Sequence, residues 1–287
     1  MRYYDNYDYE REYDKQYESL EEEDYKRLLR EGIIKNAYRT NTIKNKNVKD
    51  GHVFLESFIY PTFAKSSDVP KNEKRKETKA AQIAKNNKKA RRKLIRLINI
   101  NFGKGDLWCT FNWSDKNYPE NEERAKKDVK NFILKINRKR KKEGKSNIKY
   151  IYVLAYDEYT RPHIHMILEG DMDRDELESM WTKGTKCQTR RIVPDENGMV
   201  IGLCEYIAKN PHGTKRWCCS RNLVRPSEPT RSYTKFRKRT VEKMVNNESY
   251  LREQMEKKYP GYRLIDVELK WNGIVAAFYI YARMVRN

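Results

Sequence analysis

The sequence predicts an α+β fold in which helices flank a mainly antiparallel sheet. Segments with strand patterning alternate with segments whose apolar residues recur at helical spacing. Neighbouring strand segments are joined by short connections, as in antiparallel hairpins, and no internal repeat is present. With 287 residues, the chain is long enough for one sizeable domain with extensions or for two small domains.

Residues 1–47 are expected to form an acidic, tyrosine-rich extension. The first 32 residues hold 11 acidic and 6 basic side chains and 7 of the 21 tyrosines, with few aliphatic residues before Leu20. Such a segment cannot bury a core by itself, although a short helix is expected from Leu20 to about Glu31. The sequence leaves open whether this arm is disordered, docks on the basic remainder or contacts another protein.

Residues 48–100 are expected to add one strand and one basic helix. The run from Val53 to Tyr60 follows the turn signal Asp50-Gly51 and has the composition of a strand. Residues 71–96 then hold 12 basic and 2 acidic side chains, and apolar residues at helical spacing follow up to Ile98.

Residues 101–240 are expected to form the catalytic core. The expected elements are, in order, strand 107–113, helix 121–142, strands 150–156 and 162–168 as a hairpin, helix 173–181 and helix 202–210. Pro211 ends the last helix, because proline disfavours helix at the residue before it.

Residues 241–287 are expected to form a C-terminal extension, made of a helix and a β-hairpin. The helix should run from about Val241 to Lys258. The hairpin strands, 262–271 and 274–284, are joined by Asn272-Gly273, which is a signal for a type I′ turn.

The charge of the chain favours a polyanionic partner. An excess of 62 Lys and Arg over 41 Asp and Glu gives a formal charge of +21, so nucleic acid is the first expectation and a membrane surface the second. No long apolar run, signal peptide or lipidation motif is present, which predicts a cytoplasmic protein with no membrane partner. Five cysteines without a CxxC pair are expected to be reduced.

His163 and His165 are the first candidates for chemistry. The chain has only four histidines, and two of them one residue apart arise by chance on the order of a few per cent of the time. On a strand these imidazoles would project from one face and could chelate a divalent ion, while Ile164 points into the core. The alternative is a pair of surface or hydrogen-bonded histidines on an edge strand.

Three segments in order resemble the HUH endonucleases, named for histidine, hydrophobic residue, histidine. They are Leu107–Trp113, Arg161–Leu168 and Tyr206–Lys209. The closest resemblance is to rolling-circle replication initiators of phages and plasmids, and it covers roughly residues 90–225. It implies an HUH fold, whose sheet is similar to that of RNA-recognition (RRM-like) domains.

The resemblance implies a metal-dependent, site-specific DNA endonuclease and strand-transferase whose nucleophile is Tyr206. Attack by this phenol would leave a 5′-phosphotyrosine and a free hydroxyl that can prime synthesis. Lys209 lies three residues on, hence on the same helical face, where it could hold the scissile phosphate or favour the phenolate. The alternative is a tyrosine that packs the helix beside a lysine whose stem lies along the surface.

Magnesium or manganese is the ion that the resemblance implies, acting as a Lewis acid on the phosphate. Many family members complete the metal shell with a carboxylate or similar group on the neighbouring strand. Here the residue opposite His163 in the hairpin is Ala155, which cannot ligate. Glu158 is therefore the candidate third ligand, with Asp157 beside it, although both residue types are common in turns.

A single tyrosine is expected to carry the reaction, because the residues four positions away from Tyr206 are Gly202 and Asn210. Basic side chains around the core suit a single-stranded DNA backbone, although charge runs are often only solvated surfaces. The candidate DNA contacts are Arg161, Arg190, Arg191, Lys215, Arg216 and Arg221. Further basic stretches are 138–142 and 221–239, the latter interleaved with Tyr233 and Phe236.

Single-stranded DNA at a replication origin is the expected partner. The sequence contains no GxxxxGK[ST] phosphate-binding loop, so a host helicase and polymerase are further expected partners. One alternative is a conjugative relaxase that uses Tyr3, Tyr4 or Tyr7, whose acidic neighbours would repel a phosphate. Another is a non-catalytic nucleic-acid-binding protein with an RRM-like sheet. A chain that only recruits partners through its acidic arm would leave the charge and the histidines unexplained.

Overall fold

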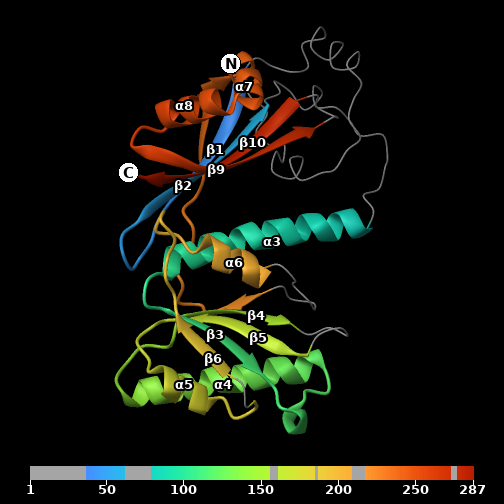
Figure 1. Ribbon diagram of the computed structural model, residues 1–287, viewed down its shortest axis with the longest axis vertical. Helices are drawn as coiled ribbons and strands as arrows, with labels where there is room; N and C mark the ends of the chain where they lie inside the picture. The colour runs from blue at the N-terminus through green and yellow to red at the C-terminus, as the bar shows by residue number, and fades with distance from the viewer. Residues whose placement is uncertain (1–36, 62–78, 156–160, 185–186, 209–216, 273–276) are drawn as a thin grey trace. The chain divides into compact units, whose positions relative to one another are not determined.

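The structure is a computed structural model, which describes residues 37–61, 79–155, 161–184, 187–208, 217–272 and 277–287. Every strand pair within this part of the chain is antiparallel, and helices accompany the strands, which confirms the predicted α+β class. The strands are divided between two five-stranded sheets, here named sheet A and sheet B (Figure 1).

Sheet A has the strand order β8-β1-β2-β10-β9. Its strands are β1 (Ala37–Lys46), β2 (Val53–Pro61), β8 (Thr230–Arg237), β9 (Tyr262–Asn272) and β10 (Ala277–Arg286). Helices α7 (Lys238–Asn246) and α8 (Glu248–Lys258) pack on it through a core that includes Ile59, Val241 and Met255.

The C-terminal region differs from the sequence prediction in two details. The single helix expected over 241–258 is divided into α7 and α8, because the extended backbone of Asn247 ends the first helix and its side chain caps the second through the Tyr250 amide. In the hairpin, Trp271 pairs with Phe278, whereas a two-residue turn at Asn272-Gly273 requires Trp271 to pair with Ile274. Residues 273–276 lie outside the described part.

Sheet B has the strand order β6-β3-β5-β4-β7, so that β5 is its middle strand. Its strands are β3 (Leu107–Asn112), β4 (Tyr150–Ala155), β5 (His163–Leu168), β6 (Cys187–Arg191) and the short β7 (Cys218–Cys219). Strands β3, β4 and β5 lie within one or two residues of their predicted bounds.

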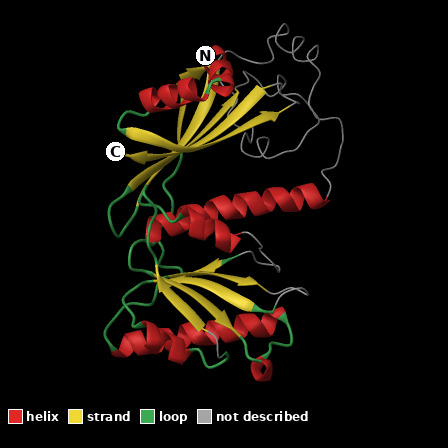
Figure 2. Cartoon of the chain, in the orientation of Figure 1, coloured by secondary structure: helices red, strands yellow, loops and turns green. Residues whose placement is uncertain are grey.

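Helices cover both faces of sheet B (Figure 2). Helices α4 (Glu122–Lys142) and α5 (Arg174–Met180) pack on one face around Phe111 and Phe132. Helix α3 (Lys79–Asn101) and helix α6 (Ile201–Ala208) pack on the other face, through apolar residues that include Leu97. Alternate residues of each strand therefore face two separate cores. A short 3-10 helix, η2 (Asp115–Asn117), follows β3.

A buried carboxylate fixes the loop before β3. Asp106 is 0% exposed, and its two oxygens accept hydrogen bonds from the amides of Gly103 at 3.0 Å and Gly170 at 2.8 Å. The ammonium of Lys49 forms an ion pair with the same carboxylate. One side chain therefore joins three segments that are far apart in the sequence.

The two sheets belong to two compact units that are each assembled from distant segments. Sheet A and its helices come from residues 37–46, 52–61 and 226 onward, and sheet B with its helices comes from 47–51 and 87–225. The expected division at residues 47, 100 and 240 followed the order of the chain, because sequence patterns mark elements but do not mark which distant strands pair. No helix of the described chain is long and apolar enough to span a bilayer.

Candidate active site

Strand β5 places both candidate histidines on the face of sheet B that α3 and α6 cover. His163 pairs with Ala155 of β4 on one side, as expected, and with Asn112 of β3 on the other. His165 pairs with Val153 of β4 and Thr110 of β3. Paired residues of antiparallel strands project from the same face.

Each imidazole is oriented by a hydrogen bond to its Nδ1 atom. Nδ1 of His163 lies 2.9 Å from the carbonyl oxygen of Arg161, which can only accept, and so this nitrogen carries the hydrogen. Nδ1 of His165 lies 3.2 Å from the hydroxyl of Thr110. Nε2 is therefore the nitrogen of each ring that is left for a metal.

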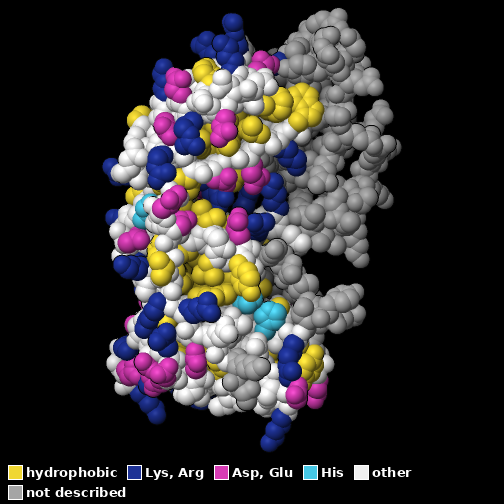
Figure 3. All heavy atoms as spheres, viewed as in Figure 1, with side chains coloured by type: hydrophobic (Ala, Val, Ile, Leu, Met, Phe, Trp, Pro, Cys, Tyr) yellow, Lys and Arg dark blue, Asp and Glu magenta, His cyan; other side chains and the backbone are white. Residues whose placement is uncertain are grey.

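The protonation state of His165 also suits a metal ligand. Burial, with a smaller contribution from His163, lowers the pKa of His165 to about 4. The ring is therefore neutral at physiological pH, which is the form that binds metal ions. Figure 3 shows histidine side chains reaching the molecular surface beside apolar side chains.

Helix α6 carries the candidate nucleophile and is fixed to α3. The side-chain oxygen of Asn99 accepts a hydrogen bond from the amide of Val200 at 2.9 Å, just before α6 begins, and Arg91 pairs with Glu205 at 3.1 Å. Cys204 and Ile207 are buried in the shared core. Tyr206 lies between them in sequence and is 61% exposed, so it does not pack the helix into that core.

Tyr206, His165 and Trp108 form an aromatic cluster. The ring centroid of Tyr206 lies 5.3 Å from that of His165 and 6.1 Å from that of Trp108. The indole of Trp108 is stacked on the His165 ring at 5.0 Å, with an angle of 18° between the planes, and His163 lies 4.8 Å from His165. Three segments that the sequence separates by almost a hundred residues thus meet at one point.

The residues that orient His165 were not singled out from the sequence. Trp108, Thr110 and Asn112 alternate along β3, so that all three share the face of the histidines. The period-two pattern was visible in the segment 107–112, but it shows only which residues share a face. Their proximity to β5 depends on the pairing of the two strands.

The third metal ligand stays a prediction, because Glu158 and its neighbour Asp157 lie outside the described residues. Within the described ranges, no group of three or more His, Cys, Asp or Glu side chains is placed to hold a metal ion. The register puts the amide side chain of Asn112 beside His163, where it offers an oxygen donor type.

The adjacent arginines Arg190 and Arg191 are used differently. Arg191 donates hydrogen bonds to the carbonyl oxygens of Gly105 at 2.8 Å, Gly170 at 2.5 Å and Met172 at 3.3 Å. No hydrogen bond or ion pair of Arg190 is found in the described part of the chain. Arg190 is exposed and pairs with Trp108 across β6 and β3, on the face of the histidines.

The other candidate DNA contacts are placed as follows. Arg161 donates to the carbonyl oxygen of Trp113 at 3.2 Å and forms an ion pair with Asp115. Arg221 is exposed, and it follows β7 at the edge of sheet B. The remaining predicted site residues, Lys209, Lys215 and Arg216, lie outside the described residues.

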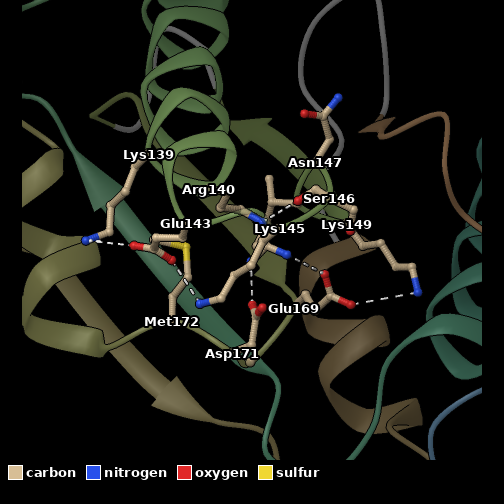
Figure 4. A network of polar contacts seen from close by, with 12 residues as sticks. Lys139, Arg140, Glu143, Lys145, Ser146, Asn147, Lys149, Glu169, Asp171 and Met172 are labelled. Atoms are coloured by element: carbon tan, nitrogen blue, oxygen red, sulfur yellow. Dashed lines mark hydrogen bonds and ion pairs between the residues drawn. The ribbon is translucent and has the colours of Figure 1, made fainter.

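The basic end of α4 is partly engaged in a network of ion pairs (Figure 4). Arg140 is buried and binds Asp171 at 2.5 Å, Glu169 at 3.4 Å and the carbonyl oxygen of Ser146 at 2.7 Å. Lys139 pairs with acidic residues, which raise its pKa. In the second basic stretch, Phe236 is buried in the core of sheet A and is not available for base stacking.

Comparison with known proteins identifies a family for the segment that contains this cluster. Residues 106–211 match the family of replication-associated proteins described by the name ORF2. The match extends from the start of β3 past the end of α6 and includes His163, His165 and Tyr206, but it covers less than half of the 287 residues. Searches among curated proteins and among solved structures found no match. This similarity supports a replication-associated protein of the initiator kind.

Proposed function

We propose that this chain is a rolling-circle replication initiator that nicks single-stranded DNA and becomes linked to it through Tyr206. The observation that carries the proposal is the position of an exposed tyrosine, on a helix fixed to α3, 5.3 Å from one imidazole of an oriented histidine pair. A tyrosine that merely packed α6 would be buried with Cys204 and Ile207.

In the proposed reaction, the phenolic oxygen of Tyr206 attacks the phosphorus of one phosphodiester. A new P–O bond forms to the tyrosine, and the bond between phosphorus and the 3′ oxygen breaks. The phenol gives up its proton, and the departing 3′ oxygen takes one up, so that no net proton is consumed. The products are a 5′-phosphotyrosine and a free 3′ hydroxyl. We propose Lys209, which follows on the same helical face, as the cation that favours the phenolate.

A divalent ion, Mg²⁺ or Mn²⁺, fits the histidine pair. The Nδ1 hydrogen bonds of His163 and His165 leave both Nε2 atoms as donors, and the low pKa of His165 keeps that ring neutral. When bound, the ion would act as a Lewis acid on the scissile phosphate. We propose that Glu158 or the amide oxygen of Asn112 supplies an oxygen ligand, which both ions prefer.

The surrounding residues are proposed to position the DNA. Arg190 projects from the histidine face, is exposed and can contact a backbone phosphate. The exposed edge of Trp108 and the ring of Tyr206 offer surfaces for a base near the scissile bond. A host helicase and polymerase would unwind the duplex and extend the released 3′ hydroxyl.

The test is formation of a covalent protein–DNA adduct. Wild-type protein, Tyr206→Phe and Tyr118→Phe are incubated with labelled origin-derived single-stranded DNA and Mn²⁺, and the products are separated on a denaturing gel. Tyr118 is a matched control because it is 49% exposed and lies outside the aromatic cluster. We expect an adduct with wild type and Tyr118→Phe and none with Tyr206→Phe.

Two results would contradict the proposal. Retained nicking by Tyr206→Phe would move the nucleophile to another tyrosine, such as Tyr3, Tyr4 or Tyr7 of a relaxase-like mechanism. Binding without any adduct by wild type, across the origin-derived sequences and with either ion, would favour the non-catalytic nucleic-acid-binding protein.

A further inference from the structure

A second concave site lies in the unit of sheet B, on the face opposite the histidines. The cavity has a volume of about 730 Å³ and is bounded by α4, β4, β7 and the residues that follow β7. Its floor includes Tyr152, which is the neighbour in sequence of Val153, and Val153 pairs with His165 on the other face. The cavity is therefore separate from the proposed nicking site.

The floor of this cavity is a pair of aromatic rings. Tyr150 and Tyr152 alternate along β4 and are stacked on the cavity side, with ring centroids 6.1 Å apart and planes at 23°. The wall formed by α4 contributes Ile133 and Leu134, and Leu134 is 41% exposed. Flat apolar surfaces of this kind suit a nucleobase, whose π-face stacks without regard to sequence.

The rim of the cavity is cationic. Lys126 and Lys130 lie one turn apart on α4, and Arg221 projects from the opposite side, whereas none of the described residues that line the cavity is acidic. Lys126 is paired with Glu122 at 2.6 Å. No ion pair of Lys130 or Arg221 is found among the described residues, so both charges are available for a phosphate.

Polar groups between the floor and the rim complete the site. Asn137 uses its side-chain oxygen to accept the amide of Ile148 at 2.8 Å, so the hydrogens of its Nδ2 are not used in that bond. Burial is the main cause that raises the pKa of Tyr150, and its phenol therefore keeps its proton as a hydrogen-bond donor. Amide and hydroxyl donors match the carbonyl oxygens of nucleobases.

We infer that this cavity binds a nucleobase of single-stranded DNA between the Tyr150–Tyr152 floor and α4, with the flanking phosphates on Lys130 and Arg221. The volume is within the roughly 300–1,000 Å³ range typical of small-molecule sites, which is ample for one nucleotide. The inference rests on the proposed function only in taking single-stranded DNA as the ligand. It adds an anchoring site that is distinct from the place of cleavage.

The experiment uses the full chain with the Tyr206→Phe substitution, in EDTA, so that binding is measured without cleavage. A short oligothymidylate containing 5-iododeoxyuridine is crosslinked by light, and the modified peptides are mapped by mass spectrometry. We expect an adduct on the segment that contains Tyr150 and Tyr152. Adducts confined to Trp108 and its neighbours would overturn the inference.

Salt dependence of binding tests the cationic rim. Neutralising one phosphate contact on a single strand lowers the slope of log affinity against log salt by about 0.7. Lys130→Gln should show this decrease, whereas Lys127→Gln should not, because Lys127 is exposed on the same helix but does not line the cavity. Equal slopes for the two variants would contradict a phosphate contact at Lys130.

Substitution of the aromatic floor tests the stacking. Tyr150→Leu should weaken binding of the oligothymidylate by about 5- to 150-fold, while Tyr150→Phe, which keeps the ring, should bind within a few-fold of the parent chain. Unchanged affinity in the leucine variant would refute the inference. If free thymidine monophosphate blocks crosslinking as effectively as the strand, the ligand is a mononucleotide and the assignment to DNA is wrong.

These outcomes are independent of the nicking reaction. Failure of the proposed function appears as the absence of an adduct at Tyr206 in the wild-type chain with Mn²⁺. Failure of the present inference appears as the absence of crosslinks and slope changes at the cavity in the Tyr206→Phe chain. Each can occur while the other result is positive.

Discussion

Replacing Thr110 with valine should weaken metal binding without disturbing the sheet. The hydroxyl of Thr110 lies 3.2 Å from Nδ1 of His165 and contributes to the orientation of that ring. Valine keeps the β-branched shape that suits β3 but cannot form the hydrogen bond. The perturbation is therefore confined to the group that orients one metal ligand.

The size of the effect follows from the other contacts of His165. Loss of such an outer hydrogen bond usually lowers metal affinity by about 10- to 100-fold. Here the ring is also stacked on Trp108 at 5.0 Å and contacts Tyr206, so it cannot rotate freely when the hydrogen bond is lost. We therefore expect the lower end of the range, a decrease of about 10-fold in the affinity for Mn²⁺.

The assay is the dependence of the nicking rate on Mn²⁺ concentration, supported by direct titration of Mn²⁺ by electron paramagnetic resonance. Thr110→Val should require about 10-fold more metal and should regain most of the wild-type rate at saturation. Thr189→Val is the matched control, since Thr189 lies in the same sheet on the opposite face, paired with Cys109. An unchanged metal requirement, or a rate that excess metal does not restore, would refute the reasoning.

Three further predictions concern the rest of the unit that contains sheet B. Asp106→Asn should lower the free energy of unfolding by about 3–5 kcal/mol in urea titrations, because an amide cannot accept from both the Gly103 and Gly170 amides or balance Lys49; a loss below about 1 kcal/mol would be inconsistent with this role. Arg190→Gln should weaken single-stranded DNA binding and leave stability unchanged, whereas Arg191→Gln should lower stability by about 1–3 kcal/mol through its carbonyl contacts; the reverse pattern would contradict their assigned roles. Burial raises the pKa of Cys109 from 9.0 to about 12, so the folded chain keeps a proton that the unfolded chain loses above about pH 9. Stability should therefore fall between these values, by at most about 1.4 kcal/mol per pH unit from this group, and Cys109→Ala should lack that part of the decrease in urea titrations at about pH 10.

The sequence predicted the elements of sheet B well where the signal was local. The apolar stripe of α4 and the alternation in β3 and β5 lie within a few residues of each other, and their bounds agree with the structure to within one or two residues. Strands β1 and β8 were not predicted. Their stabilisation comes from pairing with each other across almost two hundred residues, which leaves little local pattern.

The candidate site was only partly predictable for the same reason. His163, His165 and Tyr206 could be proposed because residue types, spacing and order carry the information. The partners of His165 could not be, because Thr110 and Trp108 reach it only through the pairing of two strands that are 55 residues apart at that point. The separate uses of Arg190 and Arg191 likewise depend on alternate directions along β6 and on the loops that Arg191 reaches.

The central position of β5 limits how the segment with the two histidines can change in length. Because β5 is hydrogen-bonded to β3 on one side and to β4 on the other, deletion of one residue would shift both ladders at once and turn Ile164 toward α6 and the imidazoles toward the α4 core. The edge strands β6 and β7 each have a single neighbour, so an insertion there disturbs only one ladder. Insertions and deletions accepted during divergence should therefore accumulate at the two borders of this sheet, while the residue count of β5 stays constant.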